Sequence, residues 1–366
     1  MSVAPIDLRA AYAEIKDELD DAISQVVAHG TYVLGPRVGV FEQEWAAYVG
    51  AVHCKSVANG LEALQMALLA VGVGAGDEVI VPSNTYIATW LAVTHCGATP
   101  VPVEPDPATY NIDVTRIAAA ITPRTAAIMP VHLYGQSADL DPVLRLAREA
   151  GIRVVEDAAQ AHGAAYRGVR VGGHGDAVAW SFYPTKNLGA FGDGGAITTN
   201  DEDIDRRIGR LRNYGECAKY RNEVCGFNSR LDELQAAILS VKLRHLDAAN
   251  ERRRVIAARY TAALDGAPLV LPSVPRWADP VWHQYVVRSK DRDQMSARMR
   301  EFGVGTLVHY PTPPHLQTAY SGLGMPPGAL PVSEALHREV LSLPMNAQLS
   351  DDDVTVVVGA VKAALE

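Results

Sequence analysis

The stretch WSFYPTKNLGAFGDGGAI, residues 180–197, contains one lysine, Lys186, in a run that is otherwise apolar, glycine-rich and nearly uncharged. An unpaired ammonium is costly to bury, because it loses its hydration. A lysine placed after a strand and before a flexible glycine-rich turn is the arrangement that a Schiff-base lysine needs, since partial desolvation keeps its neutral amine accessible. The other six of the seven lysines lie in polar surroundings or on amphipathic helices. A loop lysine that binds phosphate or solvent is the alternative interpretation.

Strands are predicted at both ends of this stretch and at four earlier places. They are residues 78–82, 99–103, 126–130, 153–156, 177–181 and 195–199. Most are continuous apolar runs, which favour a sheet covered on both faces. A helix that begins at Asp141-Pro142 and stops at Gly151 lies between two of them. This alternation predicts an α/β fold with a mainly parallel sheet.

The chain length and a change of pattern after residue 230 predict two domains. At 366 residues the chain is long for a single core. Residues 231–264 form one long amphipathic helix or a helix pair, which leads into a smaller α+β domain. HYPTPPH, residues 309–315, is expected to be a loop of that domain. The predicted division is a large domain over residues 1–240 and a small C-terminal domain over residues 241–366.

Composition excludes several classes of protein. The formal net charge of −9 argues against a nucleic-acid partner. No stretch approaches the roughly 20 apolar residues of a membrane span, and the first thirty residues are too acidic for a signal peptide. The four scattered cysteines support neither a zinc site nor disulfides. We therefore expect a soluble, cytoplasmic protein.

Nucleotide and metal motifs are also lacking. GVGAGD, residues 72–77, precedes a strand instead of following one, and no GxxxxGK[ST] occurs. His309 and His315 have no carboxylate or cysteine at metal-ligand spacing. No metal site is predicted.

Two further stretches support a cofactor site around Lys186. Asp157 follows the predicted strand at 153–156, and ligand sites of α/β proteins form at such strand ends. A carboxylate there can keep a pyridinium nitrogen protonated, although it can also simply cap a turn. Asn59-Gly60 opens an amphipathic helix, whose free amides suit a phosphate, although an ordinary N-cap has the same pattern.

These stretches resemble a known family. VANGLEAL, PSNTYIAT, VEDAAQAHGA, SFYPTKNLGAFGDGGAI, GFNSRLDELQAAIL and HYPTPPHLQ are similar, in order and spacing, to motifs of the DegT-type nucleotide-sugar aminotransferases. The resemblance runs from about residue 5 to the C-terminus. It implies a pyridoxal-phosphate enzyme of aspartate aminotransferase fold type I, with a mainly parallel, mixed seven-stranded sheet between helices in the large, cofactor-binding domain.

The resemblance also implies roles for individual residues. Lys186 is expected to form the internal aldimine and to move the proton, and Asp157 to pair with the pyridine nitrogen. The expected cofactor contacts are Gln160 at the phenolic oxygen, Tyr86 stacked on the ring, Ser181 and the amides of Gly60 and Leu61 at the phosphate, and Asn228 from a neighbouring subunit of a homodimer. Many relatives carry Thr or Ser where this chain has Leu61, so only a backbone contact is expected there.

The implied reaction is a ping-pong transamination from L-glutamate to a keto-sugar linked to a nucleoside diphosphate. Expected sugar contacts are Tyr183, His309, Tyr310 and His315. KNLGAFGDGGAI resembles members that aminate a 3-keto sugar, which favours dTDP-3-keto-6-deoxyhexose as substrate and dTDP-3-amino-3,6-dideoxyhexose as product. A 4-keto sugar or a UDP-linked 3-keto sugar is the alternative. A dehydratase or a cofactor-binding regulator is disfavoured, because dehydratases of this family replace the lysine with histidine, and a regulator is expected to lack Asp157 or Gln160.

Overall fold

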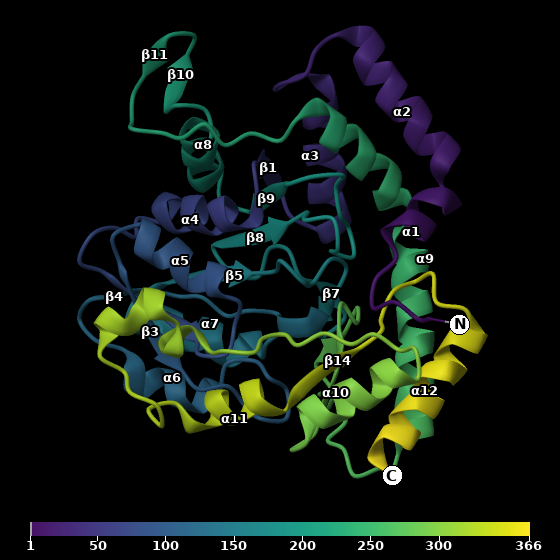
Figure 1. Ribbon diagram of the computed structural model, residues 1–366. Coiled ribbons are helices and arrows are strands. Elements are labelled where there is room, and N and C mark those ends of the chain that lie inside the picture. Colours follow the sequence, from purple (N-terminus) through teal and green to yellow (C-terminus); the bar gives the residue numbers. More distant parts are fainter. Residues whose placement is uncertain (1) are drawn as a thin grey trace.

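A seven-stranded sheet forms the centre of the computed structural model, which describes residues 2–366 (Figure 1). The strand order is β1-β9-β8-β5-β4-β2-β3. Their bounds are β1 His53–Val57, β2 Glu78–Pro82, β3 Thr99–Val103, β4 Thr125–Ile128, β5 Arg153–Asp157, β8 Ala177–Ser181 and β9 Gly195–Thr199. Strand β9 is antiparallel to both of its neighbours, and the other paired strands of the sheet are parallel. The predicted mixed, mainly parallel sheet is confirmed.

The sequence located six of these seven strands. The bounds of β2, β3, β8 and β9 agree with the prediction, and β4 and β5 differ from it by one or two residues. Strand β1 was missed. Its sequence HCKSV is not a continuous apolar run, because it lies at the edge of the sheet and pairs only with β9.

Helices cover both faces of the sheet, and alternate strand residues face each layer. On one face, α4 (Gly60–Ala70), α5 (Ile87–His95) and α8 (Glu202–Leu211) pack against residues such as Val155 and Ala179. On the other face, α6 (Val114–Ala120) and α7 (Leu140–Ala150) pack against Val154, while α3 (Pro36–Val49) covers Trp180. Figure 1 shows α4 and α5 on the side of the sheet opposite α6 and α7. This three-layer arrangement is the α/β architecture that the strand–helix alternation predicted.

A single long helix links the two packing units of the chain. Helix α9 runs without a break from Glu233 to Leu264, so the helix-pair alternative is wrong. Its first half, including Leu239, packs under the sheet beside α3, and its second half, including Tyr260, belongs to the core of the C-terminal elements. The predicted division at residues 240 and 241 therefore falls inside a helix that both units share.

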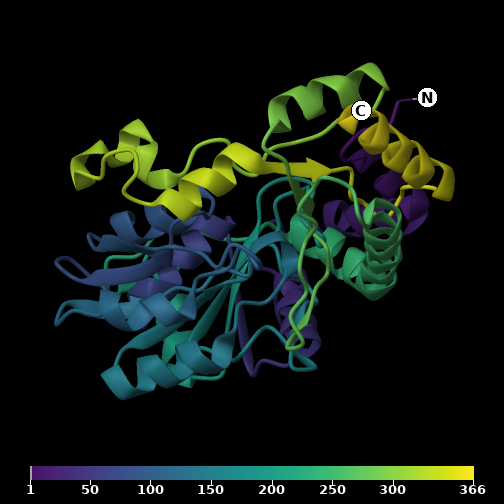
Figure 2. The same ribbon diagram turned by 90° about the horizontal axis from the view of Figure 1, so that it is seen from below.

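The C-terminal elements form the smaller unit, at one end of the molecule (Figure 2). Strands β13 (Tyr285–Arg288) and β14 (Val340–Leu343) pair antiparallel, and α10 (Arg292–Glu301) and α12 (Asp351–Leu365) pack beside them. Val3, from the other end of the chain, packs in the same core. Residues 314–323 return to the large unit, where the Tyr320 ring lies 5.2 Å from the Trp90 ring.

The remaining elements are short or peripheral. They are α1 (Leu8–Glu14), α2 (Lys16–His29), η1 (Leu133–Gly135), β6 (Ala165–Tyr166), β7 (Val169–Arg170), β10 (Glu216–Ala218), β11 (Arg221–Asn222), β12 (Ala278–Asp279), η2 (Pro314–Leu316), η3 (Thr318–Leu323) and α11 (Pro331–Glu339). No helix within residues 2–366 has the length and apolar character needed to cross a membrane.

Candidate active site

Asp157 occupies the C-terminal end of β5, near the middle of the sheet. Its side chain is 5% exposed, and one carboxylate oxygen accepts a hydrogen bond from the Ala159 amide at 3.1 Å. The other oxygen accepts from the Thr89 hydroxyl of α5 at 2.9 Å. Burial raises the pKa of this carboxyl, while the Ala159 and Thr89 donors and the nearby charge of Lys186 act in the opposite direction. A buried carboxylate held in one orientation is suited to pairing with a cationic ring nitrogen.

The N-terminus of α4 lies against the end of β8. Asn59 caps the helix by accepting from the Glu62 amide at 2.9 Å, whereas the amides of Gly60 and Leu61 donate to no acceptor in the described chain. A Cβ on Gly60 would lie 2.5 Å from the Cβ of Ser181, so only glycine allows this close approach. Two free amides, a serine hydroxyl and the positive end of the helix dipole form a concentrated set of phosphate donors.

Lys186 lies in the loop between β8 and β9, and its side chain is partly buried. Burial lowers the pKa of its amine to about 8, partly offset by the negative charge of Asp157. A depressed pKa makes the neutral amine accessible near pH 7. Within residues 2–366, no hydrogen bond or ion pair engages this ammonium group.

Lys186 is not the only lysine withdrawn from water, contrary to the sequence-based expectation. Burial also lowers the pKa of Lys242 in α9 to about 8. Its ammonium donates to the carbonyl oxygen of Gly189, and it lines the same cavity of about 100 Å³ as Lys186. Its amphipathic-helix pattern predicted an exposed side chain, and only the tertiary packing of α9 against the 184–190 loop covers it.

Gln160 connects the end of β5 to the 309–315 loop. The side-chain oxygen of Gln160 accepts a hydrogen bond from the backbone amide of Tyr134 at 2.6 Å. Its side-chain nitrogen donates to the Tyr310 hydroxyl at 3.0 Å. The Tyr310 ring lies 5.1 Å from that of Tyr86, at the start of α5. Burial raises the pKa of Tyr310, so its hydroxyl stays protonated and able to donate.

The two predicted histidines of the 309–315 loop have different surroundings. His309 Nδ1 lies 2.8 Å from the Ser342 hydroxyl of β14, and burial, with the charge of Lys186, lowers its pKa to about 4. His315 is 2% exposed and lies 3.2 Å from a carboxylate oxygen of Glu334. In this conformation, His315 has no exposed surface with which to contact a sugar.

Tyr183, Tyr86 and Asn228 are exposed in the single chain. Tyr183 and Tyr86 are each 53% exposed, and the Tyr183 amide lies 3.4 Å from the Ser181 hydroxyl. Asn228 follows the projecting β10–β11 hairpin, and its backbone forms an isolated antiparallel β-bridge with Asn213. Its predicted contact involves a second subunit, so it stays a prediction.

The residues fit pyridoxal phosphate. The α4 amides and Ser181 form a cradle for an anion, Asp157 is a buried carboxylate, and Lys186 has an amine of lowered pKa near it. Each feature matches one functional group of the cofactor: the phosphate, the ring nitrogen and the aldehyde carbon. By contrast, no group of three His, Cys, Asp or Glu side chains within residues 2–366 is placed to hold a metal ion.

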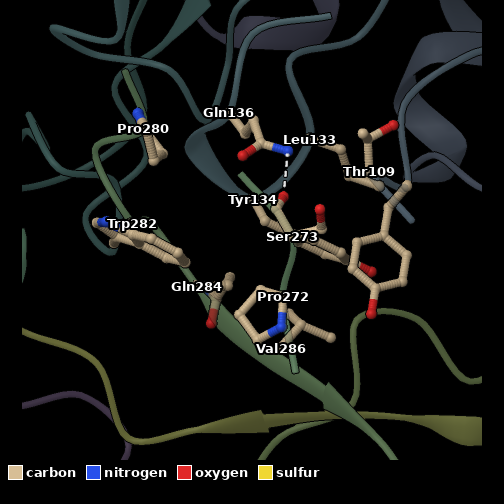
Figure 3. Close-up of a pocket in the computed structure, with 11 residues that line it drawn as sticks. Thr109, Leu133, Tyr134, Gln136, Pro272, Ser273, Pro280, Trp282, Gln284 and Val286 are labelled. Carbon is tan, nitrogen blue, oxygen red and sulfur yellow. Dashed lines mark hydrogen bonds between the residues drawn. The ribbon is translucent and has the colours of Figure 1, made fainter. Parts of the chain in front are cut away.

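A second pocket, which was not predicted from the sequence, adjoins this site at Tyr134 (Figure 3). Its lining includes Tyr134, Gln136 and Trp282, and Gln136 donates to the Ser273 carbonyl oxygen at 3.1 Å. Its lining contains none of the predicted site residues, although the Tyr134 amide donates to the side chain of Gln160 and the Tyr134 hydroxyl donates to the His309 carbonyl oxygen. Sequence reasoning also missed Thr89 and Tyr134. Thr89 lies inside the PSNTYIAT motif, which offered a signal, whereas nothing in the sequence marked Tyr134.

Comparison with known proteins agrees with this geometry. Residues 13–362 match the model of the DegT/DnrJ/EryC1/StrS aminotransferase family. The chain is 52% identical to the erythromycin biosynthesis sensory transduction protein EryC1 of Saccharopolyspora erythraea, over 99% of this chain and 100% of that one. It is 50% identical to dTDP-3-amino-3,4,6-trideoxy-α-D-glucose transaminase of Streptomyces venezuelae, over 98% and 94%. It is 51% identical to dTDP-3-amino-3,6-dideoxy-α-D-galactopyranose transaminase of Aneurinibacillus thermoaerophilus, over 97% and 98%.

A solved structure extends the similarity to three dimensions. The crystal structure of S. venezuelae DesV in complex with a ketimine intermediate superimposes with a TM-score of 0.98, at 50% identity, covering 100% of this chain and 99% of that one. Family model, curated relatives and solved structure all cover nearly the whole chain. The chain therefore belongs to the DegT/DnrJ/EryC1/StrS aminotransferase family and is a pyridoxal-phosphate-dependent transaminase.

Proposed function

We propose that this transaminase moves an amino group from L-glutamate to carbon 3 of a dTDP-linked 3-keto-6-deoxyhexose, giving a dTDP-3-amino-3,6-dideoxyhexose. The single observation that carries the chemistry is the Lys186 amine, of lowered pKa, near the buried Asp157 and the anion cradle of α4. The choice of sugar is supported by the names of two relatives at about 50% identity, both dTDP-3-amino-sugar transaminases. The sugars named for these two relatives differ, because one is a 3,4,6-trideoxy-glucose and the other a 3,6-dideoxy-galactose.

Bound pyridoxal phosphate supplies an electron sink for the carbon that loses or gains the amino group. In the proposal, Lys186 is the residue that would hold the cofactor and would carry the proton to and from the amine-bearing carbon. Asp157 keeps the ring nitrogen protonated. The amides of Gly60 and Leu61, with Ser181, bind the phosphate.

The remaining predicted residues act around this centre. Gln160 would contact the cofactor ring and its phenolic oxygen, and Tyr86 would stack on the other face of the ring. Tyr183, His309 and Tyr310 would contact the sugar, whereas we leave the covered His315 out of the proposed substrate site. We also propose that the enzyme is a cytoplasmic homodimer, in which Asn228 reaches the phosphate of the neighbouring subunit. Sedimentation analysis measures the oligomeric state.

The first test is the visible absorption spectrum with pyridoxal phosphate, before and after addition of L-glutamate. We expect a lysine-bound cofactor band in wild type that glutamate bleaches, and no such band in Lys186→Ala. Lys242→Ala is the matched control, because this lysine has the same lowered pKa of about 8 in the same cavity, and it should keep the band. A wild type that binds no cofactor, or ignores every amino donor, would sink the proposal.

The second step separates the alternatives. The glutamate-treated enzyme is offered dTDP-linked and UDP-linked sugars that carry the keto group at carbon 3 or carbon 4. Return of the original spectrum identifies the acceptor. A purely regulatory role, which the name of the EryC1 relative raises, predicts cofactor binding without turnover of any of these sugars.

A further inference from the structure

The side chain of Asn187, immediately after Lys186, makes three hydrogen bonds. The Asn187 amide nitrogen donates to the side-chain oxygen of Asn250 and to the Val281 carbonyl oxygen, both at 2.9 Å. Its own oxygen lies 3.1 Å from Nδ1 of His283. Both donor hydrogens and one acceptor site of the amide are therefore in use.

The three partners of Asn187 come from separate parts of the chain. Asn250 lies in the middle of α9 and is 1% exposed, whereas Val281 and His283 precede β13 of the small unit. Burial and the charges of Lys186 and Arg253 lower the pKa of His283 well below its ordinary value, so this ring is neutral. Because the Asn187 oxygen can only accept, the His283 Nδ1 must carry the hydrogen.

These contacts belong to a closed network of hydrogen bonds that links the segments around the base of Lys186. Asn250 also donates to the His162 carbonyl oxygen at 2.8 Å, two residues beyond Gln160. On the other side, the backbone amide of Gln284, the residue after His283, donates to the Tyr134 carbonyl oxygen at 3.3 Å. The Tyr134 amide in turn donates to the Gln160 side chain at 2.6 Å. The segment that carries Asp157 and Gln160 is thus bonded on both sides to the segment that carries Lys186.

We infer that Asn187 and His283 are positioning residues for the transamination. They hold the Lys186 amine in its direction toward the cofactor and make that direction depend on the docking of the small unit. Neither side chain has a hydrogen bond to Lys186, so they act through the backbone of the 184–190 loop and not as acid or base. The inference rests on the proposed function, since it needs Lys186 to be the reacting amine.

The pH midpoint of the lysine-bound cofactor spectrum in the holoenzyme measures this positioning. A protonated lysine–cofactor linkage is a cation, and burial disfavours a cation. Loosening the loop in Asn187→Ala admits water, so we expect the midpoint to rise and the glutamate half-reaction to slow by about 100-fold, as for a misplacement of about 1 Å. Asn200→Ala is the matched control. Asn200 also bonds two backbone groups, Val52 N–H at 2.9 Å and the Gly173 carbonyl at 3.0 Å, but in an exposed region away from Lys186.

A second pair of variants keeps the inference falsifiable if Asn187→Ala folds poorly. His283→Asn retains an N–H donor near the Nδ1 position, whereas His283→Leu removes it. We expect His283→Leu to reproduce the raised midpoint and His283→Asn to recover most of the wild-type value. The inference is overturned if Asn187→Ala and His283→Leu keep the wild-type midpoint and rate and lose only thermal stability, which is the result expected for Asn200→Ala. A wild type without lysine-bound cofactor would instead overturn the proposed function, and this inference with it.

Discussion

Thr89 shows how a residue outside the reacting set supports the site. Its hydroxyl donates to Asp157 at 2.9 Å and lies 2.8 Å from the Thr85 hydroxyl. A hydrogen bond to a carboxylate stabilises the charged form. Thr89 therefore helps to keep Asp157 ionised, although burial raises the pKa of this carboxyl.

We predict that Thr89→Val lowers kcat/KM for L-glutamate by about tenfold, the effect of losing about 1.4 kcal/mol from one charge-assisted hydrogen bond. The physical reason is that the pKa of Asp157 rises further, so this carboxyl is more readily protonated. A neutral carboxyl stabilises a protonated ring nitrogen less than a carboxylate does. Steady-state kinetics measure the change. Thr94→Val is the control, because Thr94 lies on the same helix but donates to the Trp90 carbonyl oxygen. Equal kinetics for the two variants would contradict the role of Thr89.

At the scale of elements, the site depends on where strands and helices end. Asp157 ends β5, Ser181 ends β8, and Gly60 begins α4. Parallel strands bring their carboxyl ends to one edge of the sheet, and the helix that follows β1 begins at that same edge. The fold therefore gathers residues from three distant parts of the sequence without any further adjustment.

We predict that Gly60→Ala weakens pyridoxal-phosphate binding by tenfold or more, because its Cβ would lie 2.5 Å from the Ser181 Cβ. Relief of this clash must move the first turn of α4, at an overpacking cost of about 1–3 kcal/mol. Fluorescence titration of the cofactor measures the affinity. Gly359→Ala is the matched control in α12, where nothing lies within 4 Å of the added Cβ. That variant should bind normally and gain about 0.5–1 kcal/mol of stability from better helix propensity. Normal cofactor affinity in Gly60→Ala would argue against the phosphate cradle.

At the scale of the whole molecule, buried neutral histidines make stability depend on pH. Burial lowers the pKa of His162 to about 3 and that of His337 to about 4. Between pH 6.5, the ordinary pKa of histidine, and pH 4, these side chains are protonated in the unfolded chain but not in the folded protein. The free energy of unfolding therefore falls as the pH drops through this window.

We predict that His337→Asn reduces the pH dependence of unfolding by about one proton, or about 1.4 kcal/mol per pH unit, between pH 6 and pH 4.5. Asparagine places an N–H donor near the position of His337 Nδ1, which lies 2.6 Å from the Tyr310 carbonyl oxygen, but it does not titrate. Urea denaturation at several pH values measures the slope. His29→Asn, at the exposed end of α2, is the control. An unchanged slope in His337→Asn would mean that this ring does not resist protonation in the folded state.

The sequence by itself predicted the strands of the sheet, apart from β1, and its resemblance to a family implied the residues that are proposed to bind the cofactor. Periodicity and helix caps are local, so continuous apolar runs such as β2 and β8 could be located to the residue. Asp157 and Lys186 stood out by residue type and position, and the resemblance of the motifs around them to a family implied their roles at the cofactor.

Only the tertiary structure decided the rest, because burial and partners depend on packing between distant segments. It placed Lys242 in the cavity of Lys186, covered His315 with Glu334, and showed α9 as one helix shared by both units. It also revealed the hydrogen-bond network that includes Asn187 and His283, two residues that are 96 positions apart in the sequence. Hydrogen bonds between such distant residues leave no periodic signal in a single sequence, so they follow only from the fold.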